Sequence, residues 1–135
     1  MRAVGIILAG GNSNKMRELT HKRAVAAMPI AGSYRAIDFA LSNMSNSHIQ
    51  KVAVLTQYNA RSLNEHLNSS KWWDFGRKQG GLYVFTPTIT AENGYWYRGT
   101  ADAIYQNLDF LKRCHEPYVI ITSGDAVYKM DYNKV

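Results

Sequence analysis

Three short apolar runs recur along the chain, and stretches of helical periodicity fill the intervals between them. The runs are residues 4–8, 51–55 and 118–122, and their lack of polar alternation is typical of parallel strands that are covered on both faces. Apolar side chains at helical spacing predict helices over residues 34–47, 60–68 and 100–114, and residues 80–86 are expected to form a further strand. This alternation of strands and helices predicts an α/β fold with a mostly parallel central sheet.

Small or polar residues directly follow each of the three apolar runs. Gly10 and Gly11 follow the first run, Gln57 comes soon after the second, and Asp125 comes soon after the third. Ligands of parallel α/β sheets bind beyond the carboxyl ends of the strands, so these residues are expected to meet at one ligand site. A pair of glycines also allows the backbone to approach an anion closely, with successive N–H groups aimed at phosphate oxygens.

Two sets of charged residues are candidates for phosphate chemistry at that site. Asp125 is placed to hold Mg²⁺ against substrate phosphates, although a carboxylate that caps the next turn is an alternative interpretation. Lys15, Arg17, Lys22 and Arg23 follow the glycine pair and carry the charge needed to neutralise phosphates, although they also suit a solvated basic loop.

Composition narrows the class of protein further. The chain has 135 residues, 46% of them hydrophobic, which is the size of one domain with a core of its own, and its formal charge of +6 suits a phosphorylated ligand. We expect no nucleic-acid partner, because no recognisable reading motif is present, and no membrane segment, because no apolar run approaches about 18 residues. A single cysteine, Cys114, suits a reducing cytoplasm, and two aromatic clusters at residues 72–73 and 95–97 are expected to pack beneath a loop.

Several longer motifs point to one family. LAGG occupies residues 8–11, LTHKRA 19–24, YRAIDFALSN 34–43, LTQYNARSLNEHL 55–67, WYRGTADAIYQNLD 96–109 and SGDAVYKMDY 123–132. With these motifs in this order, the chain resembles the sugar-nucleotide pyrophosphorylases, and specifically the glucose-1-phosphate adenylyltransferases, or ADP-glucose pyrophosphorylases.

The resemblance implies a Rossmann-like nucleotide-diphospho-sugar transferase domain, of which residues 1–135 would be the N-terminal part, with the rest of that domain and a C-terminal β-helix domain lying beyond. The implied reaction joins ATP and glucose 1-phosphate into ADP-glucose and pyrophosphate for glycogen synthesis, with Mg²⁺ as cofactor. Lys15 and Asp125 would be the catalytic residues, and Asp125 would also hold the metal. Gln57, Gly99 and Thr100 would lie near the adenine. The full set of implied nucleotide contacts is Leu8, Ala9, Gly10, Gly11, Gln57, Gly99, Thr100 and Ala101.

The chain departs from the pattern of the family's catalytic members at phosphate-binding positions. Those members typically read GG-x-G-T-R-L after the first strand, whereas here Ser13 replaces a glycine, Asn14 a threonine and Lys15 an arginine. They also carry a lysine at the position of Val25 and commonly a histidine at that of Ala126. Lysine lacks the planar fork with which arginine grips phosphate, and valine has no charge at all.

These departures resemble the regulatory-type subunit that some Gram-positive bacteria pair with a catalytic paralogue in a hetero-oligomer, a heterotetramer in the family. The resemblance therefore implies a cytoplasmic subunit with weak or no activity of its own. A fully active adenylyltransferase, in which Lys15 and other basic residues compensate, is one alternative. A non-enzymatic nucleotide-binding module is the other.

Overall fold

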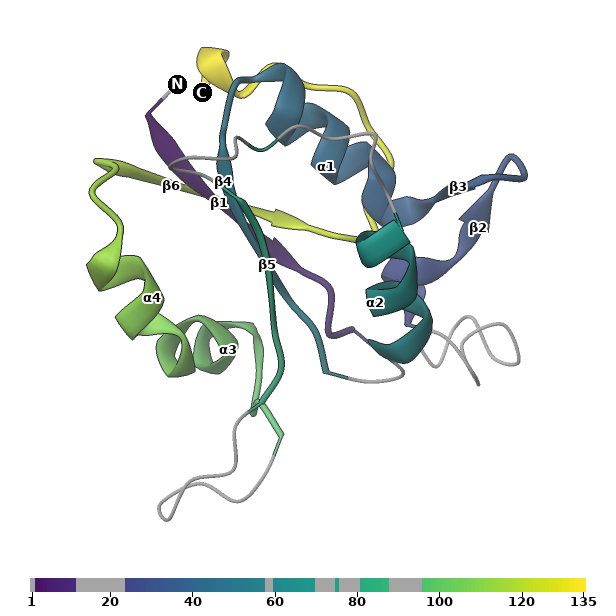
Figure 1. Cartoon of the computed structure of the whole chain (residues 1–135), viewed down its shortest axis with the longest axis horizontal. Coiled ribbons are helices and arrows are strands. Elements are labelled where there is room, and N and C mark those ends of the chain that lie inside the picture. Colours follow the sequence, from purple (N-terminus) through teal and green to yellow (C-terminus); the bar gives the residue numbers. More distant parts are fainter. Residues whose placement is uncertain (1, 12–23, 58–59, 70–74, 76–80, 88–95) are drawn as a thin grey trace.

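A parallel sheet of four strands forms the centre of the molecule. The computed structural model describes residues 2–11, 24–57, 60–69, 75, 81–87 and 96–135. The strands are β1 (Ala3–Leu8), β4 (Lys51–Leu55), β5 (Gly81–Phe85) and β6 (Tyr118–Ser123), in the spatial order β5-β4-β1-β6 with every neighbouring pair parallel (Figure 1). The predicted α/β class, the parallel sheet and all four predicted strands are confirmed.

All four strands are parallel, but the direction in which the chain adds strands across the sheet reverses once. The chain moves from β1 to β4 and on to β5, always outward on the same side, and then returns to place β6 on the other side of β1. In open sheets of this kind the helices that follow the first strands lie on one face, and those that precede the returning strand lie on the other. The gap between β1 and β6 at their carboxyl ends is therefore the topological switch point, where such folds bind ligands.

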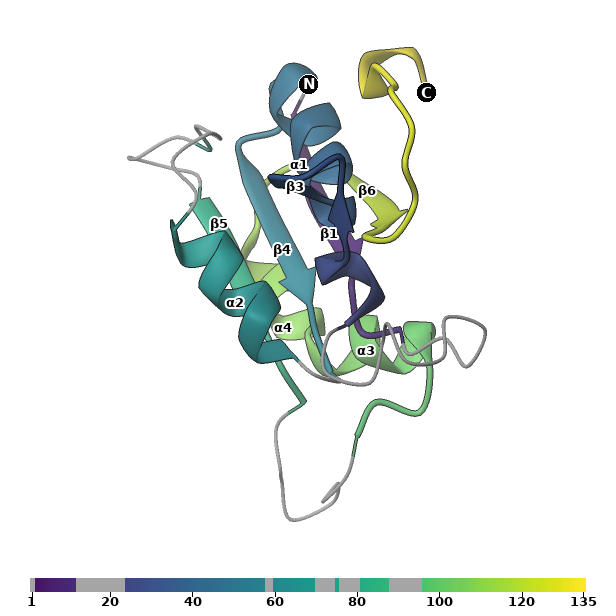
Figure 2. The ribbon, with the colours of Figure 1, turned by 90° about the vertical axis from the view of Figure 1, so that its right-hand side faces the viewer.

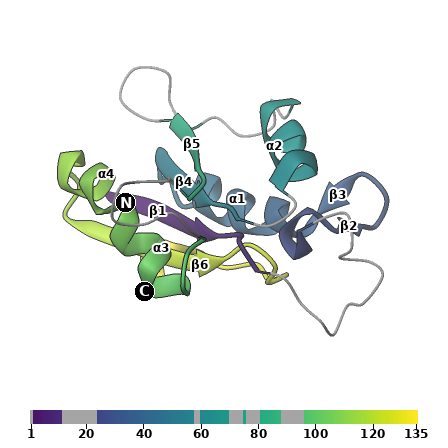
Figure 3. The same cartoon turned by 90° about the horizontal axis from the view of Figure 1, so that it is seen from below.

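Helices cover both faces of the sheet, α1 (Ala36–Asn46) and α2 (Ala60–Ser69) on one side and α3 (Thr100–Gln106) and α4 (Leu108–Arg113) on the other (Figures 1 and 3). Alternate residues of β1 divide between the two resulting cores, with Ile7 packed in the cluster of α1 and α2 and Ile6 in the cluster of α3. Gly5 lets α1 approach the sheet, because a Cβ there would lie 2.7 Å from the sulfur of Met44. None of the described helices has both the length and the apolar character required to cross a bilayer.

The predicted helix over residues 34–47 begins two residues late. Tyr34 and Arg35 form β3 (Tyr34–Arg35), which pairs with β2 (Pro29–Ile30) in a small antiparallel hairpin that projects from the body (Figure 1). The turn between them has positive φ at Ala31 and Gly32. Arg35 is extended and its N–H donates to the Asp38 carboxylate at 2.9 Å, so the helix is capped from its own first turn and starts at Ala36.

The predicted helix over residues 100–114 is wrong as a continuous element, because it divides at Asn107 into α3 and α4. The Asn107 side-chain amide donates to the carbonyl of Ala103 at 2.8 Å, and that carbonyl is the acceptor the Asn107 backbone N–H would use in an unbroken helix. The backbone N–H turns instead to Ile104 at 3.1 Å. Short polar side chains interrupt helices by this competition.

Residues 124–135 fold back along α1 (Figure 2). The side-chain amide of Asn43 donates to the carbonyl of Tyr128 at 3.0 Å, and its oxygen accepts the Met130 N–H at 3.1 Å. Ser47, fully buried, accepts the Tyr132 N–H at 2.9 Å and so holds the short helix η3 (Tyr132–Lys134). Because Asn43 and Ser47 lie one turn apart, one face of α1 supplies the polar groups that satisfy this irregular segment.

Candidate functional site

The carboxyl ends of the strands are joined by hydrogen bonds that continue past the strands themselves. Ala9 donates its N–H to Leu55 at 2.8 Å, and Gly124 donates to Leu8 at 2.9 Å. On the far side of β4, Thr56 donates to Phe85 at 2.9 Å. The segments that follow β1, β4 and β6 are thus held side by side, as the sequence predicts for polar residues at these strand ends.

A pocket of about 440 Å³ opens at these carboxyl ends, over the switch point between β1 and β6. Its walls come from the segment after β1, the short helix η2 (Val25–Ala27), the end of β4, the start of α3 and the segment after β6. Most of the lining residues are apolar or are glycines, with a few polar groups between them, as in sites for flat organic ligands. The lining residues are Leu8, Ala9, Gly10, Gly11, Val25, Ala26, Leu55, Gln57, Tyr97, Gly99, Thr100, Ala103, Ser123 and Asp125.

Most of the residues proposed from the sequence meet in this one pocket. Seven of the eight expected nucleotide contacts line it, as does Asp125, from four separate parts of the chain. Ala101, the eighth, is an exposed residue of α3 beside Thr100 and does not line the pocket. Lys15 lies outside the described residues, together with Arg17, Lys22 and Arg23.

The Gln57 side chain is fixed at the pocket wall by its oxygen. Its Oε1 accepts the N–H of Tyr97 at 2.7 Å, which joins the segment after β4 to the segment before α3. A Cβ at Gly10 would lie 3.2 Å from the Cβ of Gln57, so glycine lets the two segments approach this closely. Because the oxygen is engaged with Tyr97, the Gln57 amide presents N–H donors to a ligand in the pocket.

Tyr97 forms the hydrogen-bonded back of the site. Its ring is buried with the α3 core cluster, and its hydroxyl oxygen accepts a hydrogen bond from the Asn107 amide at 3.0 Å. Burial raises the pKa of the Tyr97 phenol more than the Asn107 hydrogen bond lowers it, so the ring stays neutral at ordinary pH. The Asn107 side chain that interrupts the helix therefore also orients this ring.

Asp125 and Ser123 provide the polar edge of the pocket beside β6. The Ser123 hydroxyl donates to the Asp125 carboxylate, and both side chains are exposed. Between them Gly124 is tightly enclosed, since a Cβ there would lie 3.2 Å from the side chains of Ala9 and Ile7. No cluster of three metal-ligating side chains, with or without Asp125, occurs among the described residues.

The wall that η2 forms against Gly124 is apolar, since a Cβ at Gly124 would lie 3.3 Å from the Cβ of Ala26. Val25 and Ala26 of η2 line the pocket, so the position where the family's catalytic members carry a lysine faces the site with a valine side chain. Ala126, the position at which the resemblance implies a histidine in many family members, is half-buried and does not line the pocket. The described surface of the pocket consequently contains no cationic side chain.

Sequence reasoning did not name several lining residues as part of the site. Leu55 and Ala103 belong to apolar patterns that predict core packing, and both do pack in the core while one edge of each reaches the pocket. Tyr97 is expected from the sequence to pack beneath a loop; in the structure it packs in the core cluster of α3, and its backbone N–H orients Gln57. Strand-end geometry is the signal for Ser123, which occupies the last position of β6.

The profile of the nucleotidyl transferase family matches residues 4–135. Glucose-1-phosphate adenylyltransferase from Clostridium perfringens is 49% identical over 132 residues, covering 98% of this chain and 34% of the relative. The proteins of the same name from Thermosipho africanus and Halalkalibacterium halodurans are each 48% identical, over 98% of this chain and 32% and 34% of their own lengths. The chain thus spans about a third of the length of the curated relatives it matches.

Among solved structures, HddC from Yersinia pseudotuberculosis matches 98% of this chain and 52% of its own chain, with a TM-score of 0.66 and 17% sequence identity. At that identity the likeness concerns the fold alone. It agrees with the Rossmann-like arrangement described above, and it adds nothing about the ligand.

Proposed function

The chain belongs to the nucleotidyl transferase family, and from this premise we propose that it acts as a glucose-1-phosphate adenylyltransferase subunit of the regulatory type. In this proposal the pocket at the switch point binds an adenine nucleotide, and a catalytic paralogue in a hetero-oligomer performs most of the chemistry. Residues 1–135 correspond to the N-terminal part of the nucleotidyltransferase domain, with the rest of it and a β-helix domain outside this sequence. Relatives that carry the enzyme's name at 48–49% identity support the choice of substrates.

The observation that carries the proposal is the meeting of Gly10, Gln57 and Asp125 at one pocket on the switch point. Apolar side chains, including Leu8 and Leu55, supply the slot that a planar base requires. The Gln57 amide, oriented by the Tyr97 N–H, donates to a ring nitrogen of the base. Adenine offers such acceptors on both of its rings.

The phosphates of the nucleotide lie toward the glycine pair and Asp125 in this proposal. Magnesium commonly reaches enzymes bound to substrate phosphates and takes only one or two protein carboxylates, so a single exposed Asp125 fits it. The ion, when bound, would neutralise negative charge on the phosphates. Gly11 is exposed, and no atom of the other described residues, its chain neighbours aside, lies within 4 Å of the position of a Cβ there, so these residues leave its backbone accessible to a phosphate.

The family reaction is attack by a phosphate oxygen of glucose 1-phosphate on the α-phosphorus of ATP. The oxygen–phosphorus bond to the sugar phosphate forms as the bond to pyrophosphate breaks, and pyrophosphate leaves. Catalysis of this step depends on positioning and on neutralising charge in the transition state. A lost donor costs a factor on the order of 10²–10³ in rate, so valine at position 25 and lysine at position 15 together support a subunit with little activity of its own.

Assay of ADP-glucose formation tests the proposal. Turnover is measured from ATP, Mg²⁺ and glucose 1-phosphate with the protein alone, and then with the protein co-expressed with a catalytic glucose-1-phosphate adenylyltransferase. We expect no turnover above background alone, and a changed turnover or effector response in the mixture. Robust turnover alone would instead make the protein an active adenylyltransferase. Nucleotide binding without any effect on a catalytic subunit would make it a stand-alone binding module.

A further inference from the structure

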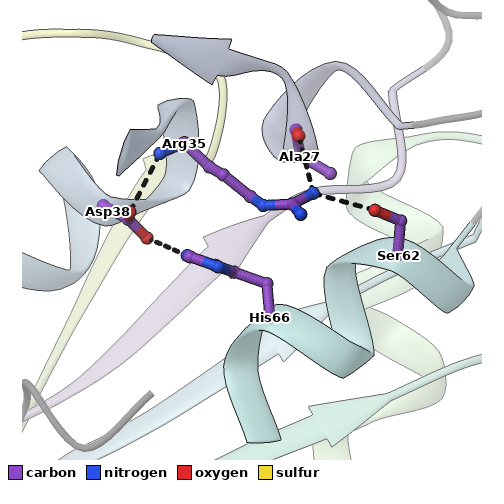
Figure 4. A network of polar contacts seen from close by, with 5 residues as sticks. All are labelled: Ala27, Arg35, Asp38, Ser62 and His66. Carbon is purple, nitrogen blue, oxygen red and sulfur yellow. Dashed lines mark hydrogen bonds and ion pairs between the residues drawn. The ribbon is translucent and has the colours of Figure 1, made fainter. Parts of the chain in front are cut away.

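A cluster of polar side chains lies behind the pocket wall and does not touch the pocket itself. Its centre is Arg35, the residue before α1, whose guanidinium reaches across to two other elements (Figure 4). The Nη1 atom donates to the carbonyl of Ala27 in η2 at 3.0 Å and to the hydroxyl of Ser62 on α2 at 2.8 Å. One nitrogen thus links the η2 wall of the pocket to the helix that follows the Gln57 segment.

A second contact fixes the same two helices relative to one another. The Nε2 atom of His66 on α2 lies 2.6 Å from Oδ1 of Asp38 on α1, and these side chains are only 16% and 10% exposed. The other oxygen of the same carboxylate accepts the backbone N–H of Arg35 at 2.9 Å. Asp38 therefore holds both the backbone of Arg35 and, through His66, the helix that carries Ser62 (Figure 4). These two contacts fix the position from which the Arg35 guanidinium reaches Ala27 and Ser62.

The helix η2 is short, and its Ala26 and Ala27 pack in the core cluster of α1 and α2. It is a single turn of three residues, its flanking residues make no side-chain caps, and two backbone hydrogen bonds close it, from Ala27 to Ala24 at 2.9 Å and from Met28 to Val25 at 3.0 Å. The last turn of a helix leaves carbonyl groups without intrahelical partners, and Arg35 supplies the partner for the carbonyl of Ala27.

We propose that Arg35 is a positioning residue for the ligand pocket, which sets the η2 wall against the segment after β4 through its bonds to Ala27 and Ser62. Arg35 and Ser62 do not line the pocket, while the backbone that Arg35 holds carries Val25 and Ala26, which do. The nature of the ligand rests on the proposed function. The positioning itself concerns only how firmly η2 is held in place, which can be measured with no ligand present.

Amide hydrogen exchange, read residue by residue in the 15N-labelled protein, tests this directly. The variants Arg35→Met and Ser62→Ala remove the donor and one acceptor, and Ser62→Thr restores the hydroxyl. Arg61→Ala is the matched control, because Arg61 lies next to Ser62 but its side chain is 92% exposed and pairs with Glu65 on its own helix. We expect exchange of the Ala27 and Met28 amides to rise about tenfold in Arg35→Met and about threefold in Ser62→Ala.

The pattern across the chain separates positioning from general destabilisation. Exchange in the central strand β4 is expected to stay unchanged in all variants, and Ser62→Thr and Arg61→Ala are expected to match the parent protein at η2. Unchanged η2 exchange in Arg35→Met would overturn the proposal, and so would an equal acceleration in η2 and β4.

ATP titration of the same variants adds a functional readout. Below their unfolding temperatures, Arg35→Met and Ser62→Ala are expected to bind ATP three- to tenfold more weakly than the parent protein, with Ser62→Thr and Arg61→Ala unaffected. Equal affinity in all five proteins would contradict a role for Arg35 in the pocket. A parent protein that does not bind ATP would refute the proposed function, while the exchange experiment would still decide whether Arg35 positions η2.

Discussion

Placing a positive charge on the apolar pocket wall is expected to strengthen ATP binding. The variant Val25→Lys restores the residue type of the family's catalytic members at a half-buried position that lines the pocket. At a separation of about 5 Å and an effective dielectric constant near 20, one unit of phosphate charge attracts the ammonium by about 3 kcal/mol. Ordering and partly desolvating the lysine side chain costs about 2 kcal/mol of this. The remaining 1 kcal/mol or so corresponds to a dissociation constant about fivefold lower.

Isothermal titration with MgATP at low and moderate salt measures this change. The control is Val119→Lys, which adds the same charge at an exposed position in the amino-terminal half of β6, away from the carboxyl-end pocket. We expect tighter binding for Val25→Lys alone, and a gain that shrinks as salt rises, since exposed charges are screened. Equal affinities for the two variants at low salt would refute the expectation that the phosphates, bound near the glycine pair and Asp125, lie within reach of a charge at position 25.

Three further changes follow from the same geometry. Gln57→Glu keeps the acceptor for the Tyr97 N–H but removes the amide donor and adds negative charge, so the ATP dissociation constant should rise about tenfold or more. The isosteric control Gln50→Glu, at the opposite end of the sheet, should leave the dissociation constant unchanged. Gly124→Ala should lower the free energy of unfolding in urea by about 1–3 kcal/mol, because its Cβ meets side chains at 3.2 Å. Gly11→Ala, whose Cβ would meet no atom of the described residues beyond its chain neighbours within 4 Å, should change it far less. Burial raises the pKa of Tyr97 in the folded state, so this residue's stabilising contribution is complete below pH about 10 and is lost as the pH rises through the folded pKa. The free energy of unfolding in urea should therefore decrease less steeply over this pH range in Tyr97→Phe than in the parent protein.

The arrangement of the sheet could be predicted from the sequence because each strand carries its own signal. The apolar runs at residues 4–8 and 51–55 form the two inner strands and are largely buried, as expected for a covered parallel sheet. The run at 118–122 is expected from its pattern to be buried as well, but it forms the edge strand β6 and leaves Tyr118, Val119 and Ile121 exposed. The polar residues after all three runs meet at the carboxyl edge. That convergence of Gly10, Gln57 and Asp125 follows from strand direction alone and needs no knowledge of side-chain contacts.

Features that depend on individual polar contacts could not be read from periodicity. The division of the long helix at Asn107 arises because a side-chain amide occupies a backbone acceptor, and helical spacing of the apolar residues continues on both sides of it. Likewise, the orientation of Gln57 depends on a backbone N–H forty residues away, and the link from Arg35 to Ala27 and Ser62 joins three elements. The Asn107 contact is local, but apolar spacing does not reveal it, and the contacts of Gln57 and Arg35 join segments that only tertiary packing brings together.

A titration of the 15N-labelled protein with MgATP, followed by amide chemical shifts, tests the central claim most directly. We expect shift changes at Gly10, Gly11, Gln57 and Thr100 that saturate together with one dissociation constant, because these residues line one pocket at the switch point. Changes confined to the polar groove around Arg2 and His115, at the amino ends of the strands, would contradict it, as would no change at saturating nucleotide.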